Sequence, residues 1–272
     1  MLSNSPAPQS GALLRSSSWQ TNRRVIGALL IRELLTRYGR NNIGFLWLFV
    51  EPGAFVLIVT LVWTLVKNVH LTNIPIVAFS LTGYSSMLLW RHSASRCMGA
   101  MKSNKALLFH RQVTIMDIFI ARILLELIAM TAAVFGLTII FYAINWLTLP
   151  EDVLELMGGW LLLCWFSAAL AMTLGGLSEK VDFIKRVWGP LSYLLMAVCG
   201  VAFTVDALPT AAQNVVLWMP MVNDLEIVRD GWFGSDFHAH FDVSYTIACN
   251  VVLTLIGVIL VRQIGFDASS DE

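Results

Sequence analysis

The chain has 272 residues, of which 57% are hydrophobic and only 13% charged, and its mean hydropathy is +0.71. Soluble globular proteins contain about 45–50% apolar and about 25% charged residues. This composition excludes a disordered chain and a nucleic-acid binder with a basic face, and it indicates an integral membrane protein. The net charge of zero, from 18 basic and 18 acidic residues, hides a separation of the two signs along the chain.

The N-terminal part precedes every long apolar run. We expect residues 1–21, which are mostly polar, to form a flexible tail. Residues 22–45 are expected to form an amphipathic interfacial helix, because Val25, Leu29 and other apolar residues recur at helical spacing opposite arginines. Such a helix lies in the membrane surface with its arginines toward lipid phosphate. It is either a simple topology anchor or a gate helix that meets an anionic lipid-linked substrate or a cytosolic partner.

Six apolar stretches within residues 46–264 are long enough to cross a bilayer. A crossing helix needs about 20 mostly apolar residues, and its backbone must be hydrogen-bonded within the protein. The sequence therefore predicts an all-α polytopic membrane domain, followed by a short cytoplasmic tail at residues 265–272. The predicted spans are residues 46–66, 74–90, 118–144, 156–177, 187–205 and 243–261.

The basic residues between these spans predict the orientation. Fifteen of the 18 Lys and Arg residues fall on one side, and only Lys67 and Arg229 fall on the other. Cytoplasmic loops carry the excess of Lys and Arg. We therefore expect both termini to be cytoplasmic.

Two connections between the predicted spans are long and partly apolar. The cytoplasmic loop, residues 91–117, is basic and contains an apolar patch at residues 106–109, which suits a short helix that docks on a cytosolic subunit. The outer loop, residues 206–242, suggests two short helices, the first between Pro209 and Pro220. Asn223 is a plausible N-cap of the second, with Glu226 completing a capping box. We expect this pair to be re-entrant or interfacial, either as a lid on the bundle or as an outer gate.

Charged residues inside the predicted spans are candidates for function. Glu51 shares a helix face with Trp47 and Phe55 at spacings i, i+4 and i+8. A carboxylate in hydrocarbon usually faces a bundle interior or a watery cavity, although Glu51 could also reach the interface or pair with a loop arginine. Arg122 and Glu126, at i and i+4, are expected to form a structural ion pair.

Motifs for catalysis and nucleotide binding are absent from the sequence. The nearest approach to a phosphate-binding loop, at residues 99–103, has Met101 where a glycine must precede the lysine. Asp236, His238, His240 and Asp242 alternate like metal ligands, but a wet acidic loop gives the same pattern. We expect no enzyme activity, no metal and no cofactor in this chain.

Two motifs resemble a known family. The stretch at residues 32–52 contains Arg37-Tyr-Gly, then Gly44-Phe-Leu-Trp, then Glu51-Pro, and it resembles the signature of ABC-2 type permeases that export capsular polysaccharide. The stretch at residues 219–229 is similar to the family's Asn-Pro-Leu…Glu…Arg segment, with Met219 in place of the usual Asn. The similarity in layout covers nearly the whole chain.

The resemblance implies a permease subunit in the bacterial inner membrane. It implies a homodimer with two copies of a cytoplasmic ABC ATPase, which binds ATP and Mg, and with periplasmic and outer-membrane polysaccharide export proteins. The substrate would be a lipid-linked acidic polysaccharide. The loop at residues 91–117 would carry the coupling helix, and the coupling candidates are Arg96, Lys102, Lys105, Leu108 and Phe109.

A route for the substrate follows from the same resemblance and from the aromatic residues. The lipid head group would meet the N-terminal arginines, and the glycan would slide along aromatic faces of the first and fifth spans and leave past the outer helix pair. The head-group candidates are Arg23, Arg24, Arg32, Arg37 and Arg40, and the path candidates are Trp47, Glu51, Phe55, Trp188, Tyr193, Trp218 and Trp232.

Other functions remain open from the sequence. One is an ABC-2 exporter of O-antigen, teichoic acid, lipid or drug. Another is an ion-coupled carrier that uses Glu51, although the chain lacks the internal repeat of many such carriers. A third is a membrane anchor for a glycan-synthesis complex.

Overall fold

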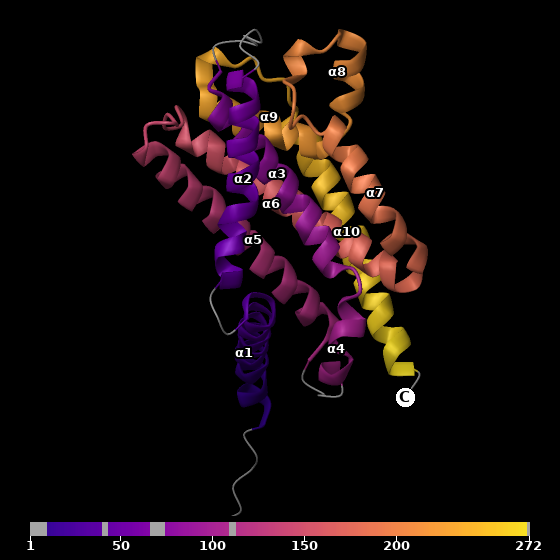
Figure 1. Cartoon of the computed structure of the whole chain (residues 1–272). Helices are drawn as coiled ribbons and strands as arrows, with labels where there is room; N and C mark the ends of the chain where they lie inside the picture. The colour runs from indigo at the N-terminus through magenta and orange to yellow at the C-terminus, as the bar shows by residue number, and fades with distance from the viewer. Residues whose placement is uncertain (1–9, 40–42, 66–73, 109–112, 271–272) are drawn as a thin grey trace, which may run out of the picture.

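The computed structural model describes residues 10–39, 43–65, 74–108 and 113–270, which form helices and connecting turns without any strand. Figure 1 shows the helices in one bundle. The helices are, in chain order, α1 (Ser10–Tyr38), α2 (Ile43–Leu65), α3 (Ile76–Cys97), α4 (Ala100–Leu108), α5 (Ile115–Ala143), α6 (Val153–Lys180), α7 (Asp182–Val198), η1 (Val205–Ala207), α8 (Thr210–Val216), α9 (Pro220–Phe233), η2 (Gly234–Asp236) and α10 (Val243–Ser270).

Each of the six predicted spans coincides with a long helix. Among the described residues, α5, α6 and the first 23 residues of α10 are long and apolar enough to cross a membrane. The other three differ in kind: α2 has a shorter apolar stretch at Phe49–Val62, α3 buries several hydroxyl side chains, and α7 has 17 residues. The all-α class is confirmed, whereas the number of six spans remains a prediction.

The fifth span is shorter than the sequence suggested. We expected residues 187–205, but α7 ends at Val198, and Gly200 follows with a φ of +83°, a conformation that favours glycine. At about 1.5 Å per residue, α7 is about 25 Å long, less than the roughly 30 Å of a bilayer core. A non-helical turn, residues 199–204, then connects α7 to η1.

Helix α6 lies at the centre of the packing. Its contacts with α3, α9 and α10 are the three most extensive contacts between any two helices of the described part. Glycines allow these close approaches: a Cβ on Gly159 would lie 2.8 Å from the backbone nitrogen of Val228 in α9, and one on Gly176 would lie 2.9 Å from Cβ of Leu260 in α10. The largest buried cluster, which includes Trp90, Leu163 and Phe166, fills the space around α6.

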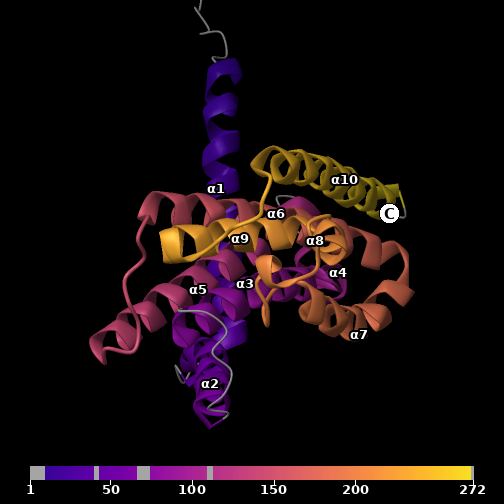
Figure 2. The same ribbon diagram turned by 90° about the horizontal axis from the view of Figure 1, so that it is seen from above.

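The two ends of the bundle carry different elements. Helices α1 and α4 and the end of α10 lie at one end, and α8 lies at the other (Figure 1). Seen along the perpendicular view, α2 and α10 lie on opposite sides of α6 (Figure 2). This grouping agrees with the arrangement of loops that the charge pattern predicts.

Helix α1 differs from the expected interfacial helix in two ways. It begins at Ser10, inside the segment expected to be a tail, and it ends at Tyr38, before residues 40–42, which lie outside the described part. Leu29 is buried, and Val25 and Leu30 pack against the cluster formed by α5 and its neighbours. The face that was expected to meet lipid therefore packs largely on protein.

The short helices in the two long loops are confirmed, but one predicted cap is wrong. Helix α4 lies in the loop that was predicted to be cytoplasmic, and α8 lies in the loop that was predicted to be outer. Helix α9 begins at Pro220 with Met219 as its N-cap, so Asn223 lies within the helix and forms no capping box. Proline suits the first helical position because its φ is preset and it has no N–H to satisfy.

Candidate functional site

Two pairs of charges join α1 to α5. Glu33 and Arg37 stand four residues apart on α1, and Arg122 and Glu126 stand four apart on α5. Arg122 Nε lies 3.4 Å from Glu33 Oε1, and Arg37 forms an ion pair with Glu126. The predicted Arg122–Glu126 pair is therefore wrong, because each of these residues pairs across the helix interface with a residue of α1.

Further hydrogen bonds extend this junction to α3 and α4. Arg122 Nη1 donates to the backbone oxygen of Arg96 at 2.7 Å, and Arg32 Nη1 donates to Asn104 Oδ1 at 2.9 Å. Asn104 is a buried polar residue of α4 and also donates to Ala100 O at 2.9 Å. Side chains thereby tie α1 to α4 and α5, and they tie α5 to α3.

Glu126 connects this junction to α3 and α2 through His92. Glu126 has no exposed side-chain surface, and His92 Nδ1 lies 3.4 Å from its Oε1. The other ring nitrogen of His92, Nε2, lies 3.5 Å from Glu51 Oε1 on α2. We call the set Asn104, Arg32, Arg37, Glu126, His92 and Glu51 the charge ladder. Side-chain contacts join its members, except that Arg32 and Arg37 are joined through the backbone of α1.

Sequence reasoning missed His92. It stands two residues beyond the predicted end of the second span, so it read as a loop residue. Helix α3 continues to Cys97, and this extension keeps His92 on the helix next to α2 and α5. A histidine two residues beyond an apolar run, with acidic residues in two other spans, is the signal that could have indicated it.

The predicted path residues on α2 lie in two different settings. Trp47 is 65% exposed, and Glu51 is partly exposed beside His92. Phe55 stacks on Tyr84 of α3 with ring centroids 3.6 Å apart. The predicted common face of these three residues thus continues from an exposed surface into the α2–α3 contact.

The predicted path residues on α7 contact α3. The guanidinium of Arg91 lies 4.1 Å from the ring centre of Tyr193, and Arg91 Nε donates to Ser192 Oγ at 3.3 Å. Trp188 is 7% exposed and donates from Nε1 to Ser95 Oγ at 2.9 Å. Tyr193 is thus an exposed aromatic surface backed by a cation, whereas Trp188 is mainly a packing residue.

An apolar cavity of about 290 Å³ lies among α2, α3 and the segment from α7 to η1. Phe55 and Val59 of α2 line it opposite Met196 and Ala197 of α7, with Phe79 of α3 also in its wall. The structure therefore brings the predicted first and fifth spans to a common space, with α3 between them (Figure 1).

The two outer tryptophans differ in exposure. Trp218 is 77% exposed after α8, but Trp232 on α9 is 3% exposed and packs in a cluster with Val56 and Leu81. Trp218 remains a candidate for the outer part of the path. The burial of Trp232 assigns it to the core of the outer end.

Arg229 stabilises the turn after α7 through hydrogen bonds to its backbone. Its guanidinium is fully buried, donates to Phe203 O at 3.0 Å and to Val201 O at 3.4 Å, and lies 3.8 Å from the ring centre of Phe79. Gly83 of α3 makes room for it, because a Cβ there would lie 2.8 Å from Arg229 Nη2. The arginine of the second sequence motif thus holds α9, α3 and residues 199–204 together.

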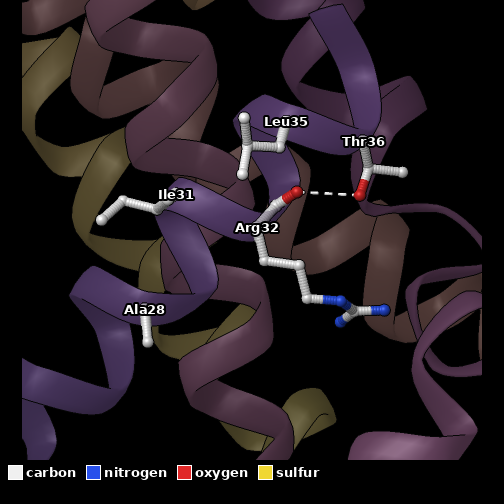
Figure 3. A pocket seen from close by; sticks show the side chains of 5 residues that line it. All are labelled: Ala28, Ile31, Arg32, Leu35 and Thr36. Atoms are coloured by element: carbon white, nitrogen blue, oxygen red, sulfur yellow. Dashed lines mark hydrogen bonds between the residues drawn. The ribbon is translucent and has the colours of Figure 1, made fainter. Parts of the chain in front are cut away.

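Two of the remaining head-group candidates lie on α1. Arg23 and Arg24 are exposed, and Arg40 lies outside the described residues. Figure 3 shows a surface hollow lined by Ala28, Ile31, Arg32, Leu35 and Thr36, in which Thr36 Oγ1 donates to Arg32 O at 2.8 Å. This surface combines exposed apolar groups with a cation.

Three of the five predicted coupling residues lie on α4 itself. Lys102 is exposed and lies 3.9 Å from Asp182 Oδ1 at the start of α7. Lys105 and Leu108 belong to the helix, although their side chains lie outside the described part, as does the whole of Phe109. Arg96 is exposed near the end of α3.

The alternating acidic and histidine residues before α10 do not converge. His240 Nε2 lies 3.2 Å from Asp206 Oδ1, and the backbone nitrogen of Asp242 donates to Asn223 Oδ1 at 2.9 Å. Within the described residues, no group of three or more His, Cys, Asp or Glu side chains is arranged to hold a metal. The observed contacts fasten this non-helical segment to η1 and α9.

The comparisons with known proteins agree on one family. Residues 24–233 match the model of the ABC-2 type transporter family. The chain is 38% identical to the capsule polysaccharide export inner-membrane protein CtrC of Neisseria meningitidis serogroup B, over 93% of this chain and 96% of CtrC.

More distant similarity extends to two further proteins. The capsule polysaccharide export inner-membrane protein BexB of Haemophilus influenzae is 34% identical over 88% of this chain and 91% of BexB. The polysialic acid transport protein KpsM of Escherichia coli is 24% identical over 90% of this chain and 95% of KpsM. On the match that covers most of its length, this chain belongs to the ABC-2 type transporter family.

Proposed function

We propose that this chain is the transmembrane permease subunit of an ABC transporter that exports lipid-linked capsular polysaccharide across the bacterial inner membrane. The observation that carries the proposal is the similarity to CtrC and BexB, which spans nearly the full length of all three chains. Membership of the ABC-2 family supports a transport role rather than a catalytic one.

The energy for transport would come from a separate ATPase subunit. The sequence contains no phosphate-binding loop. Helix α4 offers exposed lysine at the end of the bundle that the charge pattern assigns to the cytoplasm. We infer that two copies of this chain pair with two ATPase subunits, with α4 as the contact. A single bundle has little room for a polymer, whereas a two-fold seam between two copies provides a central route.

The charge ladder supports a mechanical role for α1. Closure of the ATPase subunits on ATP would displace α4, and the Arg32–Asn104 hydrogen bond and the packing of α1 on α5 would pass this displacement to α1. The lipid head group would be received near Arg23 and Arg24, which are exposed on α1.

The glycan would then pass along aromatic surfaces. Trp47 on α2 and Tyr193 on α7 are exposed, and Trp218 is exposed at the outer end. Aromatic faces hold sugars without a fixed hydrogen-bond register, so a chain can slide along them. The translocated polymer would be delivered to periplasmic and outer-membrane export proteins.

The test is the location of the polymer in a strain that lacks this gene. We expect acidic polysaccharide to accumulate inside the deletion strain and to return to the surface when the gene is restored. A variant with α4 replaced by a Gly-Ser linker of equal length should leave polymer inside. Normal surface polymer in the deletion strain would contradict capsule export and favour another ABC-2 substrate, whereas absence of polymer everywhere would favour a role in synthesis.

A further inference from the structure

His92 lies between two carboxylates that belong to different helices. Its Nε2 is 3.5 Å from Glu51 Oε1 on α2, and its Nδ1 is 3.4 Å from Glu126 Oε1 on α5. A neutral imidazole has one donor and one acceptor nitrogen, so it satisfies only one of two carboxylates. The imidazolium has two donors and matches the observed placement.

The two carboxylates are held very differently. Glu126 has no exposed side-chain surface and is anchored by Arg37 of α1, whereas the Glu51 side chain is 35% exposed and, among the described residues, forms an ion pair with His92 alone. Breaking a buried ion pair leaves an uncompensated charge and is strongly unfavourable. Glu126 is therefore the fixed end of this arrangement, and Glu51 is the end that can move.

The fixed end is connected to α4. Arg37 lies on the same helix as Arg32, one to two turns away, and Arg32 is bonded to Asn104 of α4 at 2.9 Å. The free end is connected to the predicted path, because Glu51 stands one turn from Trp47 and one turn from Phe55, which lines the apolar cavity. His92 is the side chain that joins the two halves of the charge ladder.

We propose that His92 is a positioning residue that, as an imidazolium, ties Glu51 of α2 to the Glu126–Arg37 pair and so passes a movement of α1 to the path-lining face of α2. The proposal rests on the proposed function, because it assigns His92 to the coupling of ATP hydrolysis to export. It assigns no contact with substrate to His92.

The test separates hydrolysis from export in the complex of this chain with its ATPase. His92→Gln keeps a donor for one carboxylate but removes the cation. We expect this complex to assemble and to hydrolyse ATP within about twofold of the wild-type rate, while surface polymer appears at least about tenfold more slowly, a factor equal to about 1.4 kcal/mol.

Two companion variants distinguish coupling from a structural role. His92→Arg restores a permanent cation with several donors and should recover most of the export. Glu51→Gln leaves the Glu126–Arg37 anchor intact and should reduce export to the level of His92→Gln, and the double variant should be no worse than either single one. His238→Gln, on the exposed loop before α10, is the matched control and should export normally.

Clear results would overturn the proposal. Normal export by His92→Gln, or by Glu51→Gln, would show that the link carries no movement. Failure of His92→Arg to improve on His92→Gln in assembled complexes would exclude the cation as the operative feature. If His92→Gln does not assemble, His92→Arg and Glu51→Gln decide by the same criteria. Failure of the wild-type gene to restore surface polymer would instead contradict the proposed function.

Discussion

Glu33, Arg37, Arg122 and Glu126 form two ion pairs between α1 and α5 although each helix could pair its own charges. Within each helix the two charges stand four residues apart, which is the spacing of intrahelical pairs. The pairs Glu33–Arg122 and Arg37–Glu126 form across the interface because α1 packs along α5. Helical spacing alone could not predict this exchange, because it depends on which helix packs beside α5.

Reversing one charge of this interface should weaken it, and exchanging both should restore it. Glu33→Arg places two cations together, and we expect a loss of about 1 kcal/mol in the docking of α1. The double variant Glu33→Arg with Arg122→Glu should recover most of this loss. Protease sensitivity of α1 in the detergent-solubilised complex measures the effect.

The matched control for this exchange is Arg24→Glu, an exposed position on the same helix. It should leave protease sensitivity unchanged. Equal sensitivity of Glu33→Arg and Arg24→Glu would show that the Glu33–Arg122 pair does not hold α1 in place.

The tryptophans give a second test at single residues, because sequence reasoning assigned Trp47 and Trp232 to the same path. Trp232 is 3% exposed and Trp47 is 65% exposed. Replacement of Trp232 by Ala should cost about 3–5 kcal/mol of stability, as for other buried tryptophans. Trp47→Ala should leave the thermal midpoint unchanged but reduce export. Thermal unfolding in detergent and surface polymer together check both; unchanged export with Trp47→Ala would remove that residue from the path.

At the scale of elements, α6 and α9 approach each other through glycine on both sides. The backbone nitrogen of Asp152, just before α6, donates to Gly231 O on α9 at 2.9 Å, and Gly159 faces Val228. A Cβ on Gly231 would lie 2.8 Å from Cα of Leu156, a distance that backbone cannot accommodate without moving. This crossing fixes α9 against α6 toward the end of the bundle that carries α8 (Figure 1).

Gly231→Ala should therefore separate α6 from α9. We expect a loss of about 1–3 kcal/mol, the usual cost of overpacking, and a lower thermal midpoint. Gly158→Ala is the matched control, because a Cβ there meets nothing within 4 Å and alanine favours the helix. A Gly231→Ala protein as stable as Gly158→Ala would contradict the close crossing.

The elements that could be predicted correctly are those with a strong local signal in the sequence. Long apolar runs predicted the six long helices, and paired prolines predicted α8. The start of α9 was misplaced by four residues because Asn223 resembles an N-cap, whereas the N-cap is Met219. The Asn223 side chain instead donates to Leu217 O at 2.7 Å and accepts from the backbone nitrogen of Asp242. The end of α7 was misplaced because residues 199–204 are apolar, and their turn is held by Arg229, which is distant in sequence.

At the scale of the whole molecule, the separation of elements between the two ends matches the separation of charge in the sequence. Helices α1 and α4 lie at one end with the end of α10, and α8 lies at the other (Figure 1). Lys and Arg mark the cytoplasmic side of a membrane protein. The arrangement therefore predicts that α7 crosses the bilayer despite its 17 residues, because the end of α6, which precedes it, and α8, which follows it, lie at opposite ends of the bundle (Figure 1).

Single cysteines can test this orientation in a background in which the four native cysteines are replaced. Thr148→Cys and Thr210→Cys are at exposed positions predicted to be outer, and Lys102→Cys and Lys180→Cys are at exposed positions predicted to be inner. A maleimide that cannot cross the inner membrane should label only the first two in cells with a permeable outer membrane, and all four after lysis. Labelling of Lys180→Cys and Thr210→Cys from the same side would mean that α7 does not cross, and the chain would then have an odd number of spans with its termini on opposite sides.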